Sequence, residues 1–174
     1  MSLKPTYKNP QTNSDVVPRG LQFRGTSAGS CYINKGEIAH GGMARILRAF
    51  KYDGDHEVGT DFALKIPKVN SSDLVDPLEL EAIFLSKIGG KGAVRLVERV
   101  IADPDSSDFG SIPGFVMPLL DGSDAASIFE RHCGSTNIAL NILRLALLCY
   151  EQIHAAGVVH LDAKPENLFV STDH

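Results

Sequence analysis

Short apolar segments separated by turn-forming residues run through the chain from residue 31 to residue 119. Five of them are rich in β-branched or aromatic residues and are bounded by Gly, Pro, Asn or Asp, which is typical of β-strands. The predicted strands cover residues 31–39, 46–52, 61–66, 94–102 and 115–119.

Helical spacing of apolar residues appears between the third and fourth of these strands and then throughout the last third of the chain. Residues 76–88 have this spacing and are followed by Gly89 and Gly90, which predicts a helix and its end. Further helices are predicted at residues 124–132 and 137–156, and a polar loop at residues 103–114. Strands followed by helices favour an α+β fold, with a sheet-rich part before a helical part.

The first 30 residues have a different texture from the rest. They contain three prolines, three glycines and few large apolar side chains, so they bury too little surface to offset the entropy lost on ordering. We expect a flexible tail over residues 1–30, a sheet-rich part over residues 31–120 and a helical part over residues 121–174.

Composition and charge exclude several classes of protein. Hydrophobic residues make up 43% of the 174 residues and charged residues 22%, which is typical of a globular chain and not of a disordered one. The net charge of −4, without a run of Lys and Arg, argues against a general nucleic-acid binder. No apolar stretch is long enough to span a membrane, and the polar N-terminus does not resemble a signal peptide.

The three cysteines are widely spaced and do not form the pattern of a disulfide framework. We therefore expect a cytoplasmic or nuclear protein in a reducing compartment.

The richest chemistry lies in residues 158–170, VVHLDAKPENLFV. His160, Asp162, Lys164 and Asn167 follow one another at offsets of 0, 2, 4 and 7 residues. On one tight loop, these side chains would surround a reacting phosphate with a proton acceptor, a cation and a metal-binding carbonyl. Phosphoryl transfer depends mainly on such positioning and charge stabilisation. The alternative is a surface loop of ordinary polar residues.

This segment resembles the catalytic loop of the protein kinase family, H-R-D-L-K-P-E-N. The resemblance implies that Asp162 accepts the proton of the substrate hydroxyl group and that Lys164 contacts the γ-phosphate, as in Ser/Thr kinases. It also implies that Asn167 is a ligand of Mg²⁺ and that His160 supports the loop backbone. Leu161 stands where the family has Arg, which puts control by a phosphorylated activation loop in doubt.

The segment FALKIPK on the third predicted strand resembles the V-A-I-K segment of the same family. The resemblance implies that Lys65 binds the α- and β-phosphates of ATP and pairs with a glutamate on the following helix. Glu79 and Glu81 are both candidates, and the sequence after Glu81 fits the family pattern better. On its own, a lysine at the end of an apolar strand would be a solvated strand end.

The segment from Ile38 to Ile46 lies between the first two predicted strands and resembles the Gly-rich phosphate-covering loop, G-x-G-x-x-G-x-V. Gly41 matches the central glycine and Ile46 the closing valine, whereas Ala39 and Ala44 replace the other two glycines. Alanine disfavours positive φ, so the resemblance implies a backbone farther from the phosphates and weaker nucleotide binding. The alternative is an ordinary hairpin with a Gly-Gly turn.

Residues 115–124 resemble the last strand and the hinge of the sheet-rich lobe, with Met117 as gatekeeper and Leu119 beside the adenine. Asp124 falls where the family often has a ribose-binding acid, although an ordinary strand and turn would also explain it. The nucleotide contacts implied by the resemblance come from Ile38, Ala39, His40, Gly41, Gly42, Met43, Ile46, Ala63, Lys65, Met117, Leu119, Asp124, Asn167 and Phe169. The Met-Pro hinge is similar to that of the cell-division-cycle kinases that fire replication origins.

The resemblance implies a protein-kinase-like α+β fold. It would have a five-stranded antiparallel N-lobe sheet with one helix, followed by an incomplete helical C-lobe. Lys65 and the loop residues Asp162 and Asn167 would face one cleft that holds ATP. Only seven residues follow Asn167, and they contain no Asp-Phe-Gly segment, which supplies the main Mg²⁺ ligand in the family. We therefore expect weak metal retention and exposure of Leu140, Leu143 and Leu147, which further helices would cover in the family.

Three hypotheses follow. The first, which we favour, is part of a Ser/Thr kinase domain that uses ATP and Mg²⁺ and acts on a protein substrate. The second is a non-catalytic nucleotide-binding module. The third is an interaction protein whose exposed helical surface pairs with a partner that completes the lobe.

Overall fold

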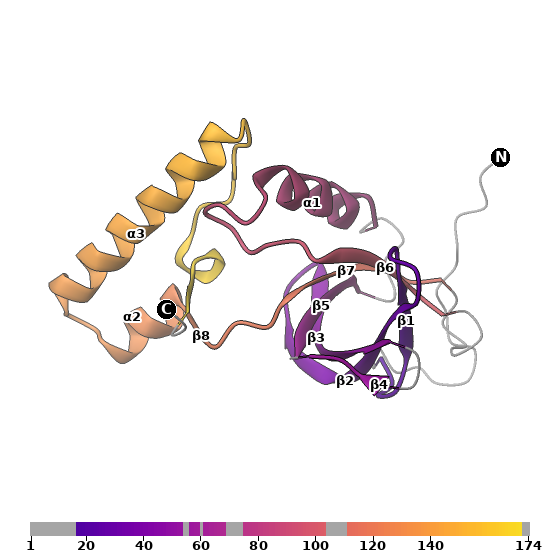
Figure 1. The fold of residues 1–174 in the computed structure, drawn as a ribbon. Coiled ribbons are helices and arrows are strands. Elements are labelled where there is room, and N and C mark those ends of the chain that lie inside the picture. The colour runs from indigo at the N-terminus through magenta and orange to yellow at the C-terminus, as the bar shows by residue number, and fades with distance from the viewer. Residues whose placement is uncertain (1–16, 54–55, 60, 69–74, 104–110, 172–174) are drawn as a thin grey trace. The chain divides into compact units, whose positions relative to one another are not determined.

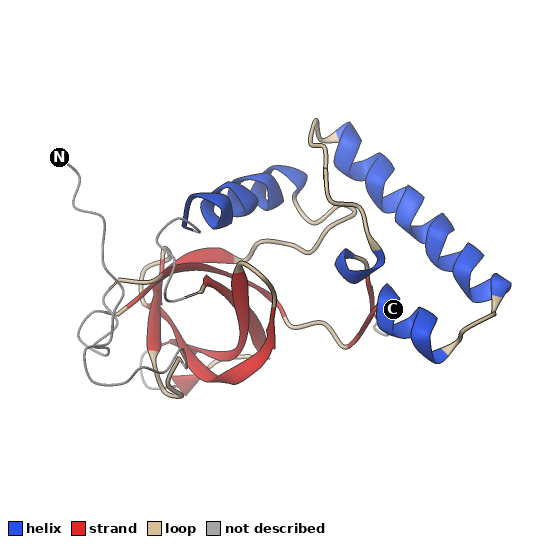
Figure 2. Ribbon diagram, turned by 180° about the vertical axis from the view of Figure 1, so that it is seen from behind, coloured by secondary structure: helices blue, strands red, loops and turns tan. Residues whose placement is uncertain are grey.

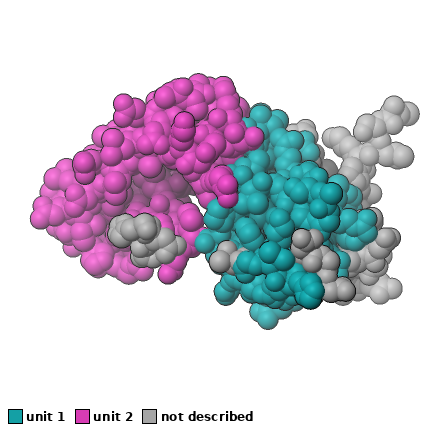
Figure 3. Space-filling model, in the orientation of Figure 1, with its two compact units in different colours: residues 1–83, 96–119 teal, residues 84–95, 120–174 magenta. Residues whose placement is uncertain are grey.

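A computed structural model describes residues 17–53, 56–59, 61–68, 75–103 and 111–171 (Figure 1). The chain divides into two compact units (Figure 3). Unit 1 contains residues 1–83 and 96–119, and unit 2 contains residues 84–95 and 120–174.

Unit 1 is built around one antiparallel sheet. Its strands are β1 (Gln22–Gly25), β2 (Ser30–His40), β3 (Ala44–Asp53), β4 (His56–Glu57), β5 (Phe62–Pro67), β6 (Glu98–Ala102) and β7 (Pro113–Pro118). The strand order is β2-β1-β6-β7-β5-β3-β4, and β2 also pairs with β3. Six of the strands therefore form a closed ring, which is visible end-on in Figure 2.

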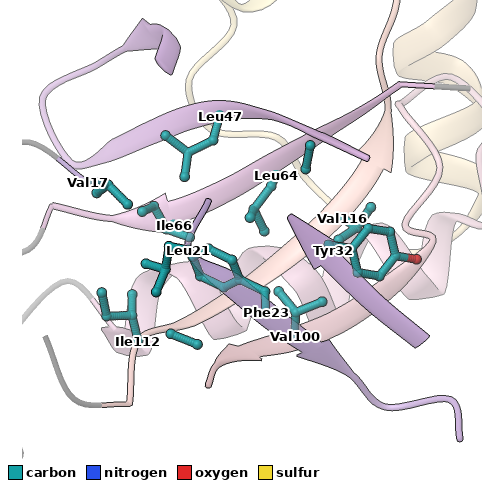
Figure 4. Packing of buried hydrophobic residues seen from close by; sticks show 12 residues of the cluster. Val17, Leu21, Phe23, Tyr32, Leu47, Leu64, Ile66, Val100, Ile112 and Val116 are labelled. Carbon is teal, nitrogen blue, oxygen red and sulfur yellow. The ribbon is translucent and has the colours of Figure 1, made fainter. Parts of the chain in front are cut away.

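The inside of this ring is the core of unit 1 (Figure 4). Side chains alternate across each strand, so every second residue of β3, β5 and β6 points inward. The inward side chains from different strands pack together with almost no exposed surface. The fully buried ones include Phe23, Tyr32, Leu47, Leu64 and Ile66.

The prediction of a flexible tail over residues 1–30 is wrong for residues 17–25. Val17, Leu21 and Phe23 are buried in the core, and β1 pairs with both β2 and β6. β1 is only four residues long, and its buried Phe23 lies between the polar residues Gln22 and Arg24. It therefore lacks the apolar run that predicts the other strands. Residues 1–16 lie outside the described residues.

The sheet has seven strands where the sequence predicted five. The five predicted strands correspond to β2, β3, β5, β6 and β7, and the two additional ones are β1 and the two-residue β4. β6 begins at Glu98, four residues later than predicted, because residues 94–97 have no regular secondary structure. The Val97 N–H donates to the Val116 carbonyl group of β7 at 2.8 Å.

A buried carboxylate joins β6 to β2 and to the loop between β1 and β2. Glu98, which is 8% exposed, accepts hydrogen bonds from the Tyr32 hydroxyl group (2.6 Å), the Ser30 hydroxyl group (3.0 Å) and the Ser27 backbone N–H (3.0 Å). Burial opposes ionisation of Glu98, but the donors together outweigh it and lower its pKa. Burial, with the hydrogen bond to Glu98, raises the pKa of Tyr32.

Glu98→Gln should destabilise unit 1 by about 1–3 kcal/mol. The NH₂ group of the glutamine side chain would face buried hydrogen-bond donors that the carboxylate now accepts from, and those donors would lose their acceptor. The folded-state pKa of Glu98 lies below its ordinary value of 4.5. Its contribution to stability is therefore present above pH 4.5 and is lost as the pH falls below this value. Urea unfolding at pH 7 and at acidic pH measures both effects. The exposed-site variant Glu79→Gln is the control, and equal stability of the two variants would contradict this role.

Helix α1 (Val75–Ile88) begins in unit 1 and ends in unit 2. Leu78, Ala82 and Leu85 are buried along one face, and Gly89 and Gly90 follow with positive φ angles of 65° and 81°. Glycine adopts these angles without strain, so the predicted end of the helix is confirmed.

Unit 2 continues with β8 (Gly122–Asp124), α2 (Ala125–Arg131), α3 (Thr136–Ala155), a short 3₁₀ helix (Pro165–Asn167) and β9 (Phe169–Ser171). Strands β8 and β9 form a separate two-stranded ribbon. Ile88, Ile153 and Val158 form a small apolar core. No helix in the described part of the chain is long and apolar enough to cross a membrane.

One face of α3 is uncovered, as the sequence predicted. Leu140, Leu143 and Leu147 are 58%, 55% and 61% exposed. They recur at intervals of three and four residues, so they share one stripe of the helix.

Candidate functional site

Lys65 and Glu81 form an ion pair within unit 1. The Lys65 Nζ atom donates to both carboxylate oxygens of Glu81, at 2.6 and 2.7 Å. Leu64 and Ile66 point into the core, so strand alternation turns Lys65 outward toward α1. The pairing with Glu81, and not with Glu79, is confirmed. The two side chains are 23% and 42% exposed, so the pair is open enough to meet a ligand.

The segment between β2 and β3 is a hairpin turn formed by residues 41–43. The Gly41 N–H donates to the Ala44 carbonyl group at 2.9 Å. Glu37 braces the turn from one side, since its carboxylate contacts His40 at 2.9 Å and Arg45 at 2.7 Å. The hydrogen bond from Arg45 is the main reason that the pKa of Glu37 is lowered. Sequence reasoning missed Glu37, although opposite charges flanking a glycine pair were a possible signal.

Neither glycine of this turn is required by the folded protein itself. Gly41 and Gly42 do not have positive φ angles, and a Cβ atom on either would meet no atom within 4 Å. Ile38 and Met43 beside them are 49% and 62% exposed. The turn thus presents open backbone to solvent, which suits close approach of a ligand, while the ordinary hairpin remains an alternative.

The predicted last strand and hinge correspond to the end of β7 and the residues that follow it. Met117 lies opposite Ala63 of β5, and Pro118 lies opposite Phe62. Ala63 is 4% exposed, whereas Met117 and Leu119 are half-buried. The strand register also places three other predicted residues side by side. Ile46 of β3 lies opposite Ala39 of β2 on one side and opposite Lys65 of β5 on the other.

Asp124 has a structural role at the start of α2. Its carboxylate accepts from the Ser127 N–H at 2.8 Å and from the Ser127 hydroxyl group at 2.7 Å, which caps the helix. These hydrogen bonds lower the pKa of Asp124. The structure thus supports the alternative of an ordinary strand and turn, and the ribose contact stays a prediction.

Asp162, Lys164 and Asn167 form one hydrogen-bonded group in unit 2. The Asp162 carboxylate accepts from Lys164 Nζ at 2.9 Å and from Asn167 Nδ2 at 2.8 Å. Asn167 Nδ2 also donates to the Asp162 backbone carbonyl group at 2.8 Å. Lys164 and then Asn167 lower the pKa of Asp162, and Asp162 raises the pKa of Lys164. The loop therefore presents an ionised carboxylate and a cation to solvent.

His160 supports the backbone of this loop. Its Nδ1 atom accepts from the Asp162 N–H at 3.3 Å, and its ring meets the Tyr150 ring edge-on, with centroids 5.7 Å apart. This contact with the loop backbone is the one that the sequence predicted.

Leu161 has a conformation that nothing in the sequence indicated. Its φ angle is 61°, and its side chain is 91% exposed. Positive φ is unfavourable for a residue with a Cβ atom. The neighbouring hydrogen bonds of His160, Asp162 and Asn167 hold the backbone in this shape.

The loop offers oxygen ligands of the kind that Mg²⁺ prefers. Asn167 is exposed, and Asp162 engages its Nδ2 atom and not its amide oxygen, which leaves that oxygen available to a ligand. Within the described ranges, no group of three or more His, Cys, Asp or Glu side chains could hold a metal ion. These residues fit a Mg²⁺ ion that is held mainly by phosphate oxygens, not a dedicated protein cage.

The predicted site residues fall into two groups, each within one unit. Unit 1 contains Lys65 with Glu81, the turn after β2, and Met117. Unit 2 contains the loop group of Asp162, Lys164 and Asn167, together with Asp124 and Phe169. Phe169 lies in β9 and is 49% exposed.

Known proteins with similar sequences are serine/threonine-protein kinases. The chain is 27% identical over 148 residues to the serine/threonine-protein kinase PknL of Mycobacterium tuberculosis, covering 83% of this chain and 34% of PknL. It is 28% identical over 171 residues to ribosomal protein S6 kinase alpha-6 of mouse, covering 96% of this chain and 20% of that kinase. No family model matches the chain.

Among solved structures, the PknI kinase domain of Mycobacterium tuberculosis superposes with a TM-score of 0.62 at 16% identity, covering 90% of this chain and 59% of that domain. This confirms the predicted fold class, an antiparallel sheet lobe with one helix followed by the first helices of a second lobe. The chain spans about a third of PknL and less than two thirds of the PknI domain.

Proposed function

We propose that this chain, which is homologous to part of the serine/threonine protein kinase domain, carries the ATP-binding and phosphoryl-transfer residues of such a domain. The observation that carries the proposal is the Lys65–Glu81 ion pair at 2.6 Å. An ion pair of this kind fixes a lysine amine and keeps it charged, ready to contact phosphate oxygens.

In this proposal, both groups of residues act on one nucleotide. Lys65 binds the α- and β-phosphates, the turn around Gly41 covers them, and Met117 and Leu119 border the adenine. Asp162 accepts the proton of a substrate Ser or Thr hydroxyl group while the hydroxyl oxygen bonds to the γ-phosphorus. The bond between the γ-phosphorus and the bridging oxygen breaks, and ADP leaves with that oxygen. Lys164 neutralises charge on the transferred group.

Further contacts with the nucleotide and its metal ion are proposed for Asn167, Asp124 and Phe169. The amide oxygen of Asn167 would be a ligand of Mg²⁺, which supplies charge neutralisation on the phosphates when bound. Asp124 and Phe169 as nucleotide contacts rest on their positions in the family pattern alone. The likeness to the origin-firing kinases also stays a prediction.

We expect negligible phosphoryl transfer by the 174-residue chain on its own. Its sequence contains no Asp-Phe-Gly segment after Asn167, so Mg²⁺ would lack its main carboxylate ligand. Incubation with γ-³²P-ATP, Mg²⁺ and a generic protein substrate measures this. Transfer above the level of an Asp162→Asn control would contradict the expectation.

A second candidate function is favoured by the Lys65–Glu81 pair, since phosphate binding by Lys65 does not require phosphoryl transfer. A chain that holds ATP or ADP through Lys65 without transferring phosphate would be a non-catalytic nucleotide-binding module. Its signature would be thermal stabilisation by nucleotide without phosphate incorporation, and an unchanged melting curve at millimolar nucleotide would reject it.

A third candidate, a protein-interaction module, is favoured by the exposed leucines of α3. Leu140, Leu143 and Leu147 leave apolar surface on one stripe of the helix. A defined complex or oligomer in solution would support this function, and a monodisperse monomer would count against it.

Substitutions of the two glycines of the turn distinguish an effect on ATP binding from an effect on folding stability. Gly41→Val and Gly42→Val should leave the free energy of unfolding within about 0.5 kcal/mol of wild type, since neither backbone strain nor packing requires glycine there. If the turn covers the phosphates, each variant should weaken ATP binding about tenfold. Calorimetric titration together with urea unfolding measures both quantities. Wild-type affinity in both variants would identify the turn as an ordinary hairpin.

A further inference from the structure

Asn34 of β2 is a polar residue that is fully buried in unit 1, at 0% exposure. Its Nδ2 atom donates to the Pro18 carbonyl group at 2.7 Å and to the Val17 carbonyl group at 3.4 Å. Its Oδ1 atom accepts from the Gly36 backbone N–H at 2.8 Å. A buried amide is costly unless it is hydrogen-bonded, so a residue of this kind in an apolar core indicates a need for these particular bonds.

The hydrogen bond to Gly36 spans a β-bulge. Asn34 lies opposite Ala49 of β3. Gly36, two residues further on, lies opposite Arg48, which is only one residue away from Ala49. β2 therefore contains one extra residue here, Lys35, as in other bulges. Gly36 has a φ angle of 137°, which favours glycine, and the side chain of Asn34 holds the backbone in this shape.

Residues 17–21 pack against β2 at the same place. The Gly20 N–H donates to the Asn34 carbonyl group at 2.7 Å, and the Asn34 N–H donates to the Leu21 carbonyl group at 2.9 Å. Leu21 is buried in the core. Asn34 is thus fixed by its backbone and by its side chain, and the bulge has one defined position along β2.

The bulge decides which residue of β2 shares a face with Lys65. Successive residues of a strand point to opposite faces, and directly opposed residues of paired strands point to the same face. With the bulge in place, Ile46 of β3 lies opposite both Ala39 and Lys65. Without the extra residue, the pairing slips by one position. Counting onward from Asn34 then places Glu37 opposite Ile46.

The bulge therefore keeps a carboxylate away from Lys65. Glu37 now lies opposite Leu47, whose side chain points into the core, and so it is on the other face of the sheet from Lys65. There it contacts His40 at 2.9 Å and Arg45 at 2.7 Å. After the slip, its negative charge would lie on the face where Lys65 binds phosphate in the proposed function. Like charges repel, so ATP binding would be weakened.

We propose that Asn34 is a positioning residue for nucleotide binding, which fixes the bulge and so keeps the Glu37 carboxylate off the face of Lys65. This role rests on the proposed function, because it concerns the phosphates that Lys65 would bind. Adenosine has no phosphate and should be insensitive to the slip. The expected signature is a loss of the preference for ATP over adenosine, which a loss of folding stability alone does not produce.

Two substitutions act on the same bulge from different residues. Asn34→Leu removes the three side-chain hydrogen bonds, and Gly36→Ala strains the backbone. Each should weaken binding of Mg²⁺–ATP about tenfold and leave the affinity for adenosine within about twofold of wild type. Calorimetric titration with both ligands measures this, and Gly36→Ala decides the question if Asn34→Leu does not fold. Glu98→Gln, a buried polar substitution in β6, is the stability control and should bind ATP as wild type does.

A further substitution assigns the cause. In the Asn34→Leu and Gly36→Ala proteins, Glu37→Gln should restore ATP affinity about fivefold, because it removes the carboxylate from the Lys65 face. In the wild-type protein the same substitution should change ATP affinity by less than about twofold. Nuclear Overhauser contacts in the nucleotide-free proteins give the register directly. Those of Ile46 should pass from Ala39 to Glu37 when the bulge is lost.

Two results would overturn the proposal alone. One is a variant that keeps Ala39 opposite Ile46, and the other is a variant that loses this register and still prefers ATP to adenosine as wild type does. Failure of Glu37→Gln to restore affinity would contradict the repulsion on which the proposal depends. Wild-type protein that binds ATP no more tightly than adenosine would overturn the proposed function and this role with it, and the register measured without nucleotide keeps the two failures distinct.

Discussion

Lys65→Met is expected to weaken ATP binding by about 10- to 150-fold. Charge-assisted hydrogen bonds contribute about 1.5–3 kcal/mol each, and Lys65 Nζ is held by Glu81 at 2.6 and 2.7 Å in a position to make them with phosphate oxygens. Methionine keeps the length and the apolar stem of the side chain. Calorimetric titration with Mg²⁺–ATP gives the affinity, and thermal unfolding with and without nucleotide gives an independent measurement.

The matched control is Lys68→Met, three residues along the chain. Lys68 is half-buried just after β5 and forms no ion pair with any residue that the structure describes. This variant should bind ATP as wild type does. Loss of the ion pair alone should change the free energy of unfolding by less than about 1 kcal/mol, because both side chains of the pair are partly exposed. Equal ATP affinity of the two variants would contradict a phosphate-binding role for Lys65.

Gly122→Ala is expected to destabilise unit 2 by about 3 kcal/mol or more. Gly122 has a φ angle of 149°, and a Cβ atom there would collide with the backbone carbonyl oxygen of Val170 in β9. Since backbone cannot move aside as a flexible side chain can, the β8–β9 ribbon must open. β9 begins two residues after Asn167, so the hydrogen bonds between Asn167 and Asp162 should be lost with it.

Gly134→Ala is the control for Gly122→Ala, because it has the strain of a positive φ angle without a collision. Gly134 has a φ angle of 87°, but a Cβ atom there would meet nothing within 4 Å. Its replacement should therefore destabilise the protein by only about 1–2 kcal/mol and leave the side-chain amide signals of Asn167 unchanged. Thermal unfolding and ¹H–¹⁵N spectra measure both effects. Equal destabilisation by the two substitutions would show that the ribbon does not hold the loop.

Most of the fold could be predicted because its elements have strong local patterns. The apolar runs of β2, β3, β5 and β7 and the glycine pair that ends α1 required no knowledge of distant contacts. β1 could not be found in this way. Its burial of Phe23 depends on pairing with β6, more than 70 residues later, where Phe23 lies opposite Ala102.

The candidate site was predictable where a fixed spacing defines it. Lys65 and Glu81, and the group formed by Asp162, Lys164 and Asn167, lie in contact as the motifs indicated. The positive φ of Leu161 has no local signal, because it arises from hydrogen bonds that form only in the folded loop. The cap of α2 is local, since Asp124 binds Ser127 three residues on and Asp is a preferred N-cap residue.

The proposed function requires that both groups of residues bind one nucleotide. Its most direct test is a titration of ¹⁵N-labelled protein with Mg²⁺ and a non-hydrolysable ATP analogue. We predict that the backbone signals of Gly41, Gly42 and Met117 and the side-chain amide signal of Asn167 change with the same half-saturation concentration. Signals that change at different concentrations, or a response from only one of the two groups, would contradict the account.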